Sequence, residues 1–183
     1  MDSGFIVEYI DWMYGKTKWV SKHDDYRDYS FIWERDDYHE IMLKVAERIF
    51  EYEKETSFYS YFQVFFGLNR SDQELQNVNP RQVNLLMALI ESRPNDRDFM
   101  RFVFSLISNF SIENRVQFVS KFVELNGSFD DFKQLPLEPD CSFWSGSSVP
   151  MLQRRIEYLK SLIPVFNTVS LLKHKQYVEY RIK

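Results

Sequence analysis

The residues best suited to chemistry lie near the start of the chain, where histidines and carboxylates cluster. His23 is followed directly by Asp24, and the same stretch also carries Asp25, Asp28, Glu34, Asp36, Asp37, His39 and Glu40. An adjacent His–Asp pair can help to hold a divalent metal for hydrolysis. Such a shell also needs an earlier histidine, and none precedes His23. A metal-dependent hydrolase centred on His23 and Asp24 is therefore only our second alternative for the function of the chain. The simpler interpretation of these residues is that they are solvated loop charges and helix caps.

Other catalytic patterns are missing from the sequence. The five glycines are scattered and form no phosphate-binding loop. One cysteine and three widely spaced histidines do not supply a standard structural zinc site. Cys141 and His174 could act as nucleophile and base only if folding brought them together, and a lone thiol is more often incidental. We expect no catalytic residue, no metal, no cofactor and no enzymatic activity.

The C-terminal end of the chain is basic. From Gln153 to Lys183, seven Lys and Arg stand against two Glu, a local net charge of +5 that leaves −9 for residues 1 to 152. Basic residues interleaved with aromatic ones can bind nucleic acid, and they can also form a docking face for a protein. The candidate contact residues are Arg154, Arg155, Lys160, Lys173, Lys175 and Arg181. The plainer interpretation is a solvated helix surface.

The elements that position these residues should be helices. With 17 Phe and 11 Tyr against 5 Gly, the chain is rich in side chains that fill space between helices and poor in turn formers. We therefore expect an all-α fold, an antiparallel array or compact bundle of about 7–9 helices that is α-solenoid-like in its middle. It should form one domain over residues 1–183, divided into an irregular acidic part (1–56), a regular helical array (57–134), a loop (135–149) and a basic helical pair (150–183).

Capping residues predict where the helices begin. Asp36 and Asp37 precede a run with helical periodicity that extends to about Glu55. In the middle of the chain, caps recur at a spacing of 16 residues, at Asn79, Asn95 and Ser111. Further predicted starts are Ser128 for a short turn through Phe132, Pro150 for a helix ending at Pro164, and Val169 for the last helix.

The expected environment is the cytoplasm. No apolar run approaches the roughly 18 residues that span a bilayer, and the first residues lack the basic start and apolar centre of a signal peptide. The single cysteine, Cys141, rules out an internal disulfide and fits a reducing compartment. We expect no membrane association.

A resemblance is carried by residues at the C-terminal end: Phe143-Trp144-Ser145-Gly146-Ser147, Val149-Pro150-Met151-Leu152, Arg155-Ile156-Glu157-Tyr158-Leu159 and Leu172-Lys173-His174-Lys175-Gln176-Tyr177. This region resembles the C-terminal tail of large bacterial multidomain NTPase-like proteins, some of which are associated with defence against phage. The resemblance implies a helical C-terminal module of a larger bacterial protein. No activity can be carried over, because the ATPase and nuclease motifs of such parents are absent from this sequence.

Our leading hypothesis is a non-enzymatic helical module that recognises a protein partner or mediates self-association. It rests on abundant Phe, Tyr and Trp, which dominate contact energy at interfaces, combined with the missing chemistry. The first alternative is a nucleic-acid-binding helical domain that uses the basic C-terminal helices.

Overall fold

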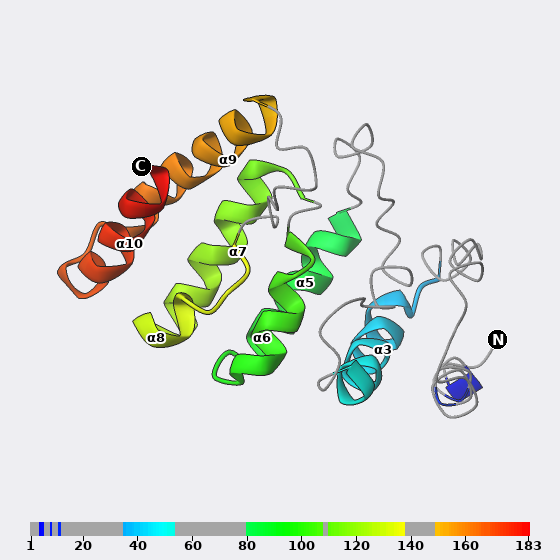
Figure 1. The fold of residues 1–183 in the computed structure, drawn as a ribbon. Coiled ribbons are helices and arrows are strands. Elements are labelled where there is room, and N and C mark those ends of the chain that lie inside the picture. Colours follow the sequence, from blue (N-terminus) through cyan, green and yellow to red (C-terminus); the bar gives the residue numbers. More distant parts are fainter. Residues whose placement is uncertain are drawn as a thin grey trace. The chain divides into compact units, whose positions relative to one another are not determined.

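The computed structural model describes residues 35–53, 80–107, 110–137 and 149–183, together with Gly4, Phe5, Glu8 and Asp11 (Figure 1). Within these ranges the regular elements are seven α-helices and two short 3₁₀ helices, with no strand. The expected all-α class is confirmed. Several predicted features lie outside the described residues, namely His23 with Asp24, Cys141, the stretch 57–66 and most of the loop 135–149.

The chain divides into two compact units, residues 1–85 and residues 86–183. The boundary falls inside helix α5 (Pro80–Ser92), after Leu85. The sequence gives no sign of this division, because a helix runs through it where a linker would normally show a change in composition.

The described core of the first unit is built on α3 (Tyr38–Glu53). Before this helix, the guanidinium of Arg35 donates two hydrogen bonds to the Asp37 carboxylate, at 2.7 and 2.8 Å. The predicted periodicity is confirmed, since Tyr38, Ile41, Met42, Val45 and Ile49 are all buried. One face of α3 is therefore buried.

The predicted cap at Ser111 is confirmed, and the one predicted at Asn95 is shifted by one residue, while Asn79 lies outside the described residues. Asp96, the residue after Asn95, begins α6 (Arg97–Phe104), where its side chain accepts a hydrogen bond from the backbone N–H of Phe99 at 3.0 Å. Ser111 begins α7 (Ile112–Leu125), where its hydroxyl accepts from the N–H of Asn114 at 3.3 Å. Each cap satisfies a backbone N–H that has no partner within the first turn of its helix.

Helix α7 lies between the α5–α6 pair and α9 (Val149–Leu162) (Figure 1). Its contact with α6 is aromatic, because the rings of Phe104 and Phe122 meet edge to face with centroids 5.6 Å apart. The ammonium of Lys121 lies 2.9 Å from the Glu91 carboxylate of α5, and α7 packs against α9 on its other side. This helix is therefore covered on two sides, as its apolar residues on two faces predict.

The short helix α8 (Phe129–Phe132) begins at the predicted cap Ser128, whose hydroxyl accepts from the N–H of Asp131 at 3.3 Å. The Asp131 carboxylate also binds the Arg97 guanidinium at 2.7 Å. Next to it, the buried Asn126 amide donates to the Pro94 carbonyl at 3.0 Å and to Asp131 at 3.2 Å. These bonds fasten α8 to the turn between α5 and α6.

The C-terminal end is a helical hairpin. Helix α9 continues into the 3₁₀ helix η4 (Ile163–Phe166), which contains Pro164, and the chain then passes through η5 (Val169–Leu171) into α10 (Leu172–Ile182). Helix α10 packs against α9, η4, η5 and α8. No helix within the described residues has the length and apolar character needed to cross a membrane.

Candidate interaction surface on α9 and α10

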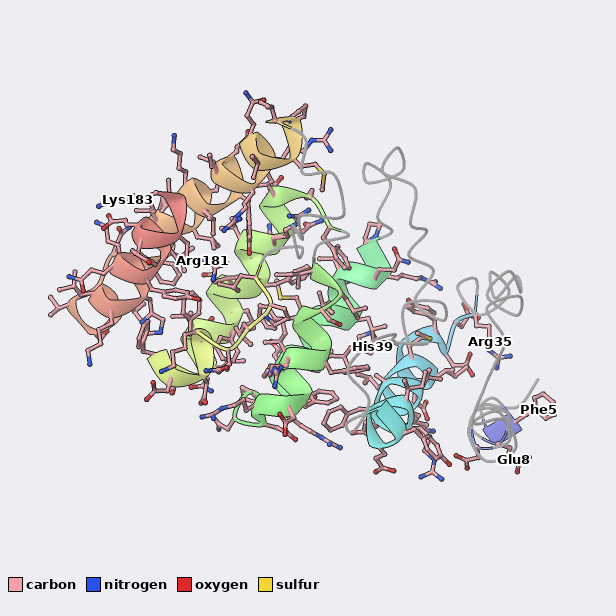
Figure 2. The ribbon with its side chains drawn as sticks, viewed as in Figure 1. Phe5, Glu8, Arg35, His39, Arg181 and Lys183 are labelled. Atoms are coloured by element: carbon pink, nitrogen blue, oxygen red, sulfur yellow. The ribbon has the colours of Figure 1, made fainter. Side chains whose placement is uncertain are left out.

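All six basic residues proposed from the sequence lie on the C-terminal hairpin: Arg154, Arg155 and Lys160 on α9, and Lys173, Lys175 and Arg181 on α10. Arg155 and Lys175 are half-buried and the other four are exposed. Figure 2 labels Arg181, with Lys183, at the end of α10. The guanidinium of Arg181 donates to the Tyr177 hydroxyl at 3.1 Å and lies 5.9 Å from the centroid of that ring.

The hairpin brings these cations onto two neighbouring helices but not onto one face. Consecutive residues of a helix point about 100° apart, so Arg154 and Arg155 leave α9 in different directions. Lys173 and Lys175 likewise point about 160° apart on α10. A helix that tracks a phosphate backbone would carry its cations along one stripe, so the basic residues are better described as scattered around the hairpin.

Exposed apolar side chains distinguish this hairpin from the rest of the described chain. Eight large apolar side chains are exposed among the described residues, and six of them lie between residues 149 and 180. These six are Val149, Leu152, Ile156, Val169, Leu172 and Tyr180. Isolated exposed apolar residues are ordinary, but a concentration of them commonly marks an interaction site.

Helical spacing aligns these residues into two strips. On α9, Val149, Leu152 and Ile156 follow the i, i+3, i+7 pattern and share one side of the helix over about 10 Å. On α10, Leu172 and Tyr180 are eight residues apart and fall on one side, with the exposed Gln176 between them. Tyr180 is 73% exposed.

The periodicity of α9 groups Leu152, Ile156, Leu159 and Ile163 on one face, but the sequence does not say which part of that face is covered. In the structure the buried residues of α9 are Tyr158, Leu159 and Leu162. The buried face is therefore rotated toward Tyr158, and Leu152 and Ile156 lie at the surface. Apolar residues occupy a wider part of the α9 surface than the neighbouring helices cover. This width, which can be read from the sequence, is the feature that could have revealed the exposed strip.

A half-buried arginine of α7 contacts a buried tyrosine of α9. The guanidinium carbon of Arg115 lies 5.3 Å from the centroid of the Tyr158 ring, and its Nε donates to the Phe110 carbonyl at 2.7 Å. Burial lowers the pKa of Arg115, and the nearby Tyr158 opposes this change. The direction of the change follows from the loss of water around the charged guanidinium.

His174 was considered from the sequence as a general base, and the structure places it in an apolar environment. Its imidazole is 1% exposed, and neither ring nitrogen has a hydrogen-bond partner among the described residues. It packs against Phe129, Phe132 and Phe166. The burial of His174 is difficult to predict from the sequence, because the lysines on either side of it, Lys173 and Lys175, are typical of a solvated surface.

The acidic stretch at the start of α3 contains no metal site within the described residues. Asp37 is paired with Arg35, and the Glu40 carboxylate binds the Lys44 ammonium at 2.7 Å. His39 is exposed, at the start of the helix (Figure 2). Comparisons with protein-family models, with curated proteins and with solved structures gave no match to this chain.

Proposed function

We propose that this chain is a non-enzymatic helical interaction module that binds a protein through the outer surface of α9 and α10. The observation that carries the proposal is the concentration of six exposed apolar side chains on this hairpin. Removing such side chains from water on binding supplies the main driving force of most protein association.

The charge of the hairpin indicates the kind of partner. Residues 153–183 carry a net charge of +5, and complementary charges accelerate association and select the partner. An acidic protein surface meets this requirement. A symmetric dimer through the same surface would place one basic hairpin opposite another, because a twofold interface pairs each patch with itself. The charges therefore favour a different protein over symmetric self-association.

Nucleic-acid binding is the second proposal, and one observation favours it. The exposed Tyr180 lies on a helix that also carries Lys173, Lys175 and Arg181, and aromatic rings next to cations can stack on bases. The apolar strip of α9 has no role in such a complex, which is why we rank this function below protein binding.

The resemblance to the tails of large bacterial NTPase-like proteins supports a further part of the proposal, that the module works at the C-terminal end of a larger bacterial protein. The neighbouring coding sequence tests this part directly. An in-frame upstream NTPase or nuclease would support it, and a complete, independent gene would contradict it.

Light scattering of the purified chain, combined with a pulldown from the native cell, tests the main proposal. We expect a specific protein to be retained with the chain, or a mass above that of the monomer. A strictly monomeric chain that retains no protein would contradict an interaction module.

A further inference from the structure

His174 connects α10 to two other elements of its unit. Its ring centroid lies 5.4 Å from that of Phe129 and 4.8 Å from that of Phe132, both on α8. It is also stacked on Phe166 of η4, at 5.7 Å with an angle of 23° between the rings. The buried residues of α10 are His174 and Val178, and the half-buried Tyr177 also packs against Phe129 and Phe132. The imidazole is therefore one of the two fully buried side chains that attach this helix.

This attachment suits the neutral form of the ring. A neutral imidazole carries one N–H, which the face of a neighbouring phenyl ring can accept as a weak hydrogen bond. Protonation adds a second N–H and a full charge. Neither ring nitrogen has a polar partner within the described residues, and a charge without a polar partner is strongly disfavoured in an apolar site.

The acidic groups nearest in the fold are already engaged. On α8, Asp130 binds the Lys133 ammonium at 2.6 Å, and Asp131 binds Arg97 and Asn126. Neither carboxylate has a contact with His174 in the described structure. The 3₁₀ helices η4 and η5 contain no titratable residue.

The remaining charges on the packed helices are mostly positive. Helix α10 itself carries Lys173, Lys175, Glu179 and Arg181, as well as Tyr177, whose hydroxyl accepts from Arg181. Helix α9 carries Arg154, Arg155, Glu157 and Lys160. This balance would repel an imidazolium rather than compensate it.

We propose that His174 is a pH-dependent latch, which holds α10 against α8 and η4 while it is neutral and releases α10 when it is protonated. Release would remove the α10 half of the surface assigned above, and this consequence rests on the proposed function. The latch itself does not, because it concerns only the packing of α10 on its own unit.

The direction of the pH dependence follows from the surroundings of the ring. Burial lowers the pKa of His174 below its usual value, so the unfolded or detached helix takes up a proton at a higher pH than the packed helix does. The stabilisation is therefore complete above the unfolded pKa of about 6.5, and it is lost as the pH falls from there toward the lower pKa of the packed state.

Nuclear magnetic resonance of the full chain can test the latch without any partner. The imidazole resonances would be titrated between about pH 7.5 and pH 5, a range that brackets the ordinary histidine pKa. We expect the midpoint of His174 to lie below the ordinary histidine value of about 6.5, because burial lowers the pKa of this ring. His174→Phe identifies the His174 resonance, and it also supplies an apolar ring of similar size that does not titrate.

Amide hydrogen exchange, corrected for the intrinsic effect of pH, gives the second readout. Below about pH 6.5, opening of residues 172–182 should increase by up to about tenfold per pH unit, the limit for one proton. Residues 112–125 of α7 should change far less, and His174→Phe should abolish the pH dependence. If His174→Phe does not fold, the wild-type titration and exchange still decide the question, and His174→Met is the second replacement.

Three results would overturn the latch. They are a His174 midpoint at or above about 6.5, exchange in α10 that does not change through the titration, and the same acid-induced opening in His174→Phe. These results would overturn the latch but would not contradict the proposed protein binding at neutral pH. Conversely, a chain that binds no protein could still release α10 when His174 is protonated.

Discussion

Arg115 of α7 lies over the ring of Tyr158 of α9, with its guanidinium carbon 5.3 Å from the ring centroid. This pair joins the helical array in the middle of the chain to the hairpin that carries the exposed apolar strips. Because Arg115 also donates to the Phe110 carbonyl, its removal would cost both a cation–π contact and a hydrogen bond to a backbone group.

Arg115→Met should lower the free energy of unfolding by about 1–3 kcal/mol, because it leaves the Phe110 carbonyl without this donor and removes the cation from the ring. Denaturant unfolding followed by circular dichroism measures the change. Arg101→Met is the matched control, since Arg101 is exposed and its ion pair with Asp98 spans 4.0 Å, so its effect should stay within about 0.5 kcal/mol. Equal losses in the two variants would contradict a structural role for the contact between Arg115 and Tyr158.

Asn126 should be the most sensitive polar residue of the second unit. Its amide donates to Pro94 and Asp131, and its side-chain oxygen accepts from the N–H of Ser128 at 2.9 Å. Asn126→Ala would leave these groups without their partner at a buried position, at a cost of about 2–3 kcal/mol. Asn114→Ala provides the control, because Asn114 contributes its backbone N–H to the cap at Ser111. We expect a loss in thermal stability for Asn126→Ala alone.

Protonation of the Asp131 carboxylate should make the second unit less stable in acid. Hydrogen bonds from Asn126 and Arg97 hold the pKa of Asp131 below its usual value. A carboxyl whose pKa is lowered by folding stabilises the protein above its unfolded pKa of about 3.9, and this contribution is lost as the pH falls through the lower folded pKa. Asp131→Asn should therefore reduce the dependence of the melting temperature on pH below about 4. An unchanged dependence would show that Asp131 does not contribute to it.

Nucleic-acid binding makes a separate prediction. If the basic hairpin binds phosphates, affinity for a labelled oligonucleotide should fall steeply with salt, and it should be lost when Arg154, Arg155, Lys173 and Lys175 are neutralised together. Neutralising the exposed Arg101 of α6 instead should change little. Affinity that is absent, or that does not depend on salt, would exclude this second function.

Local signals made the helices predictable. Ser111 and Ser128 each occupy the cap position that the sequence indicates, because a short polar side chain before an apolar-periodic run satisfies a free backbone N–H there. The cap expected at Asn95 lies one residue later, at Asp96. The buried stripe of α3 follows from its periodicity in the same way. These features depend only on residues close together in the chain.

Properties that depend on distant residues were less predictable. Whether Leu152 and Ile156 are covered depends on which helices pack against α9, and periodicity alone cannot say so. The burial of His174 depends on Phe129 and Phe132 of α8, which are far from it in the sequence and meet it only after folding. The division of the chain inside α5 is likewise a property of the packed units, since the helix itself is continuous.

The central claim is that the exposed apolar strip of α9 binds a protein, and a matched pair of leucines tests it most directly. Leu152 of α9 and Leu125 of α7 are each 40% exposed, so a glutamate at either position should disturb the fold to a similar small extent. Pulldown and light scattering at neutral pH would compare Leu152→Glu and Leu125→Glu with the unchanged chain. We predict that Leu152→Glu loses the retained protein or the higher mass while Leu125→Glu keeps it, whereas equal behaviour of the two variants would contradict the proposed surface.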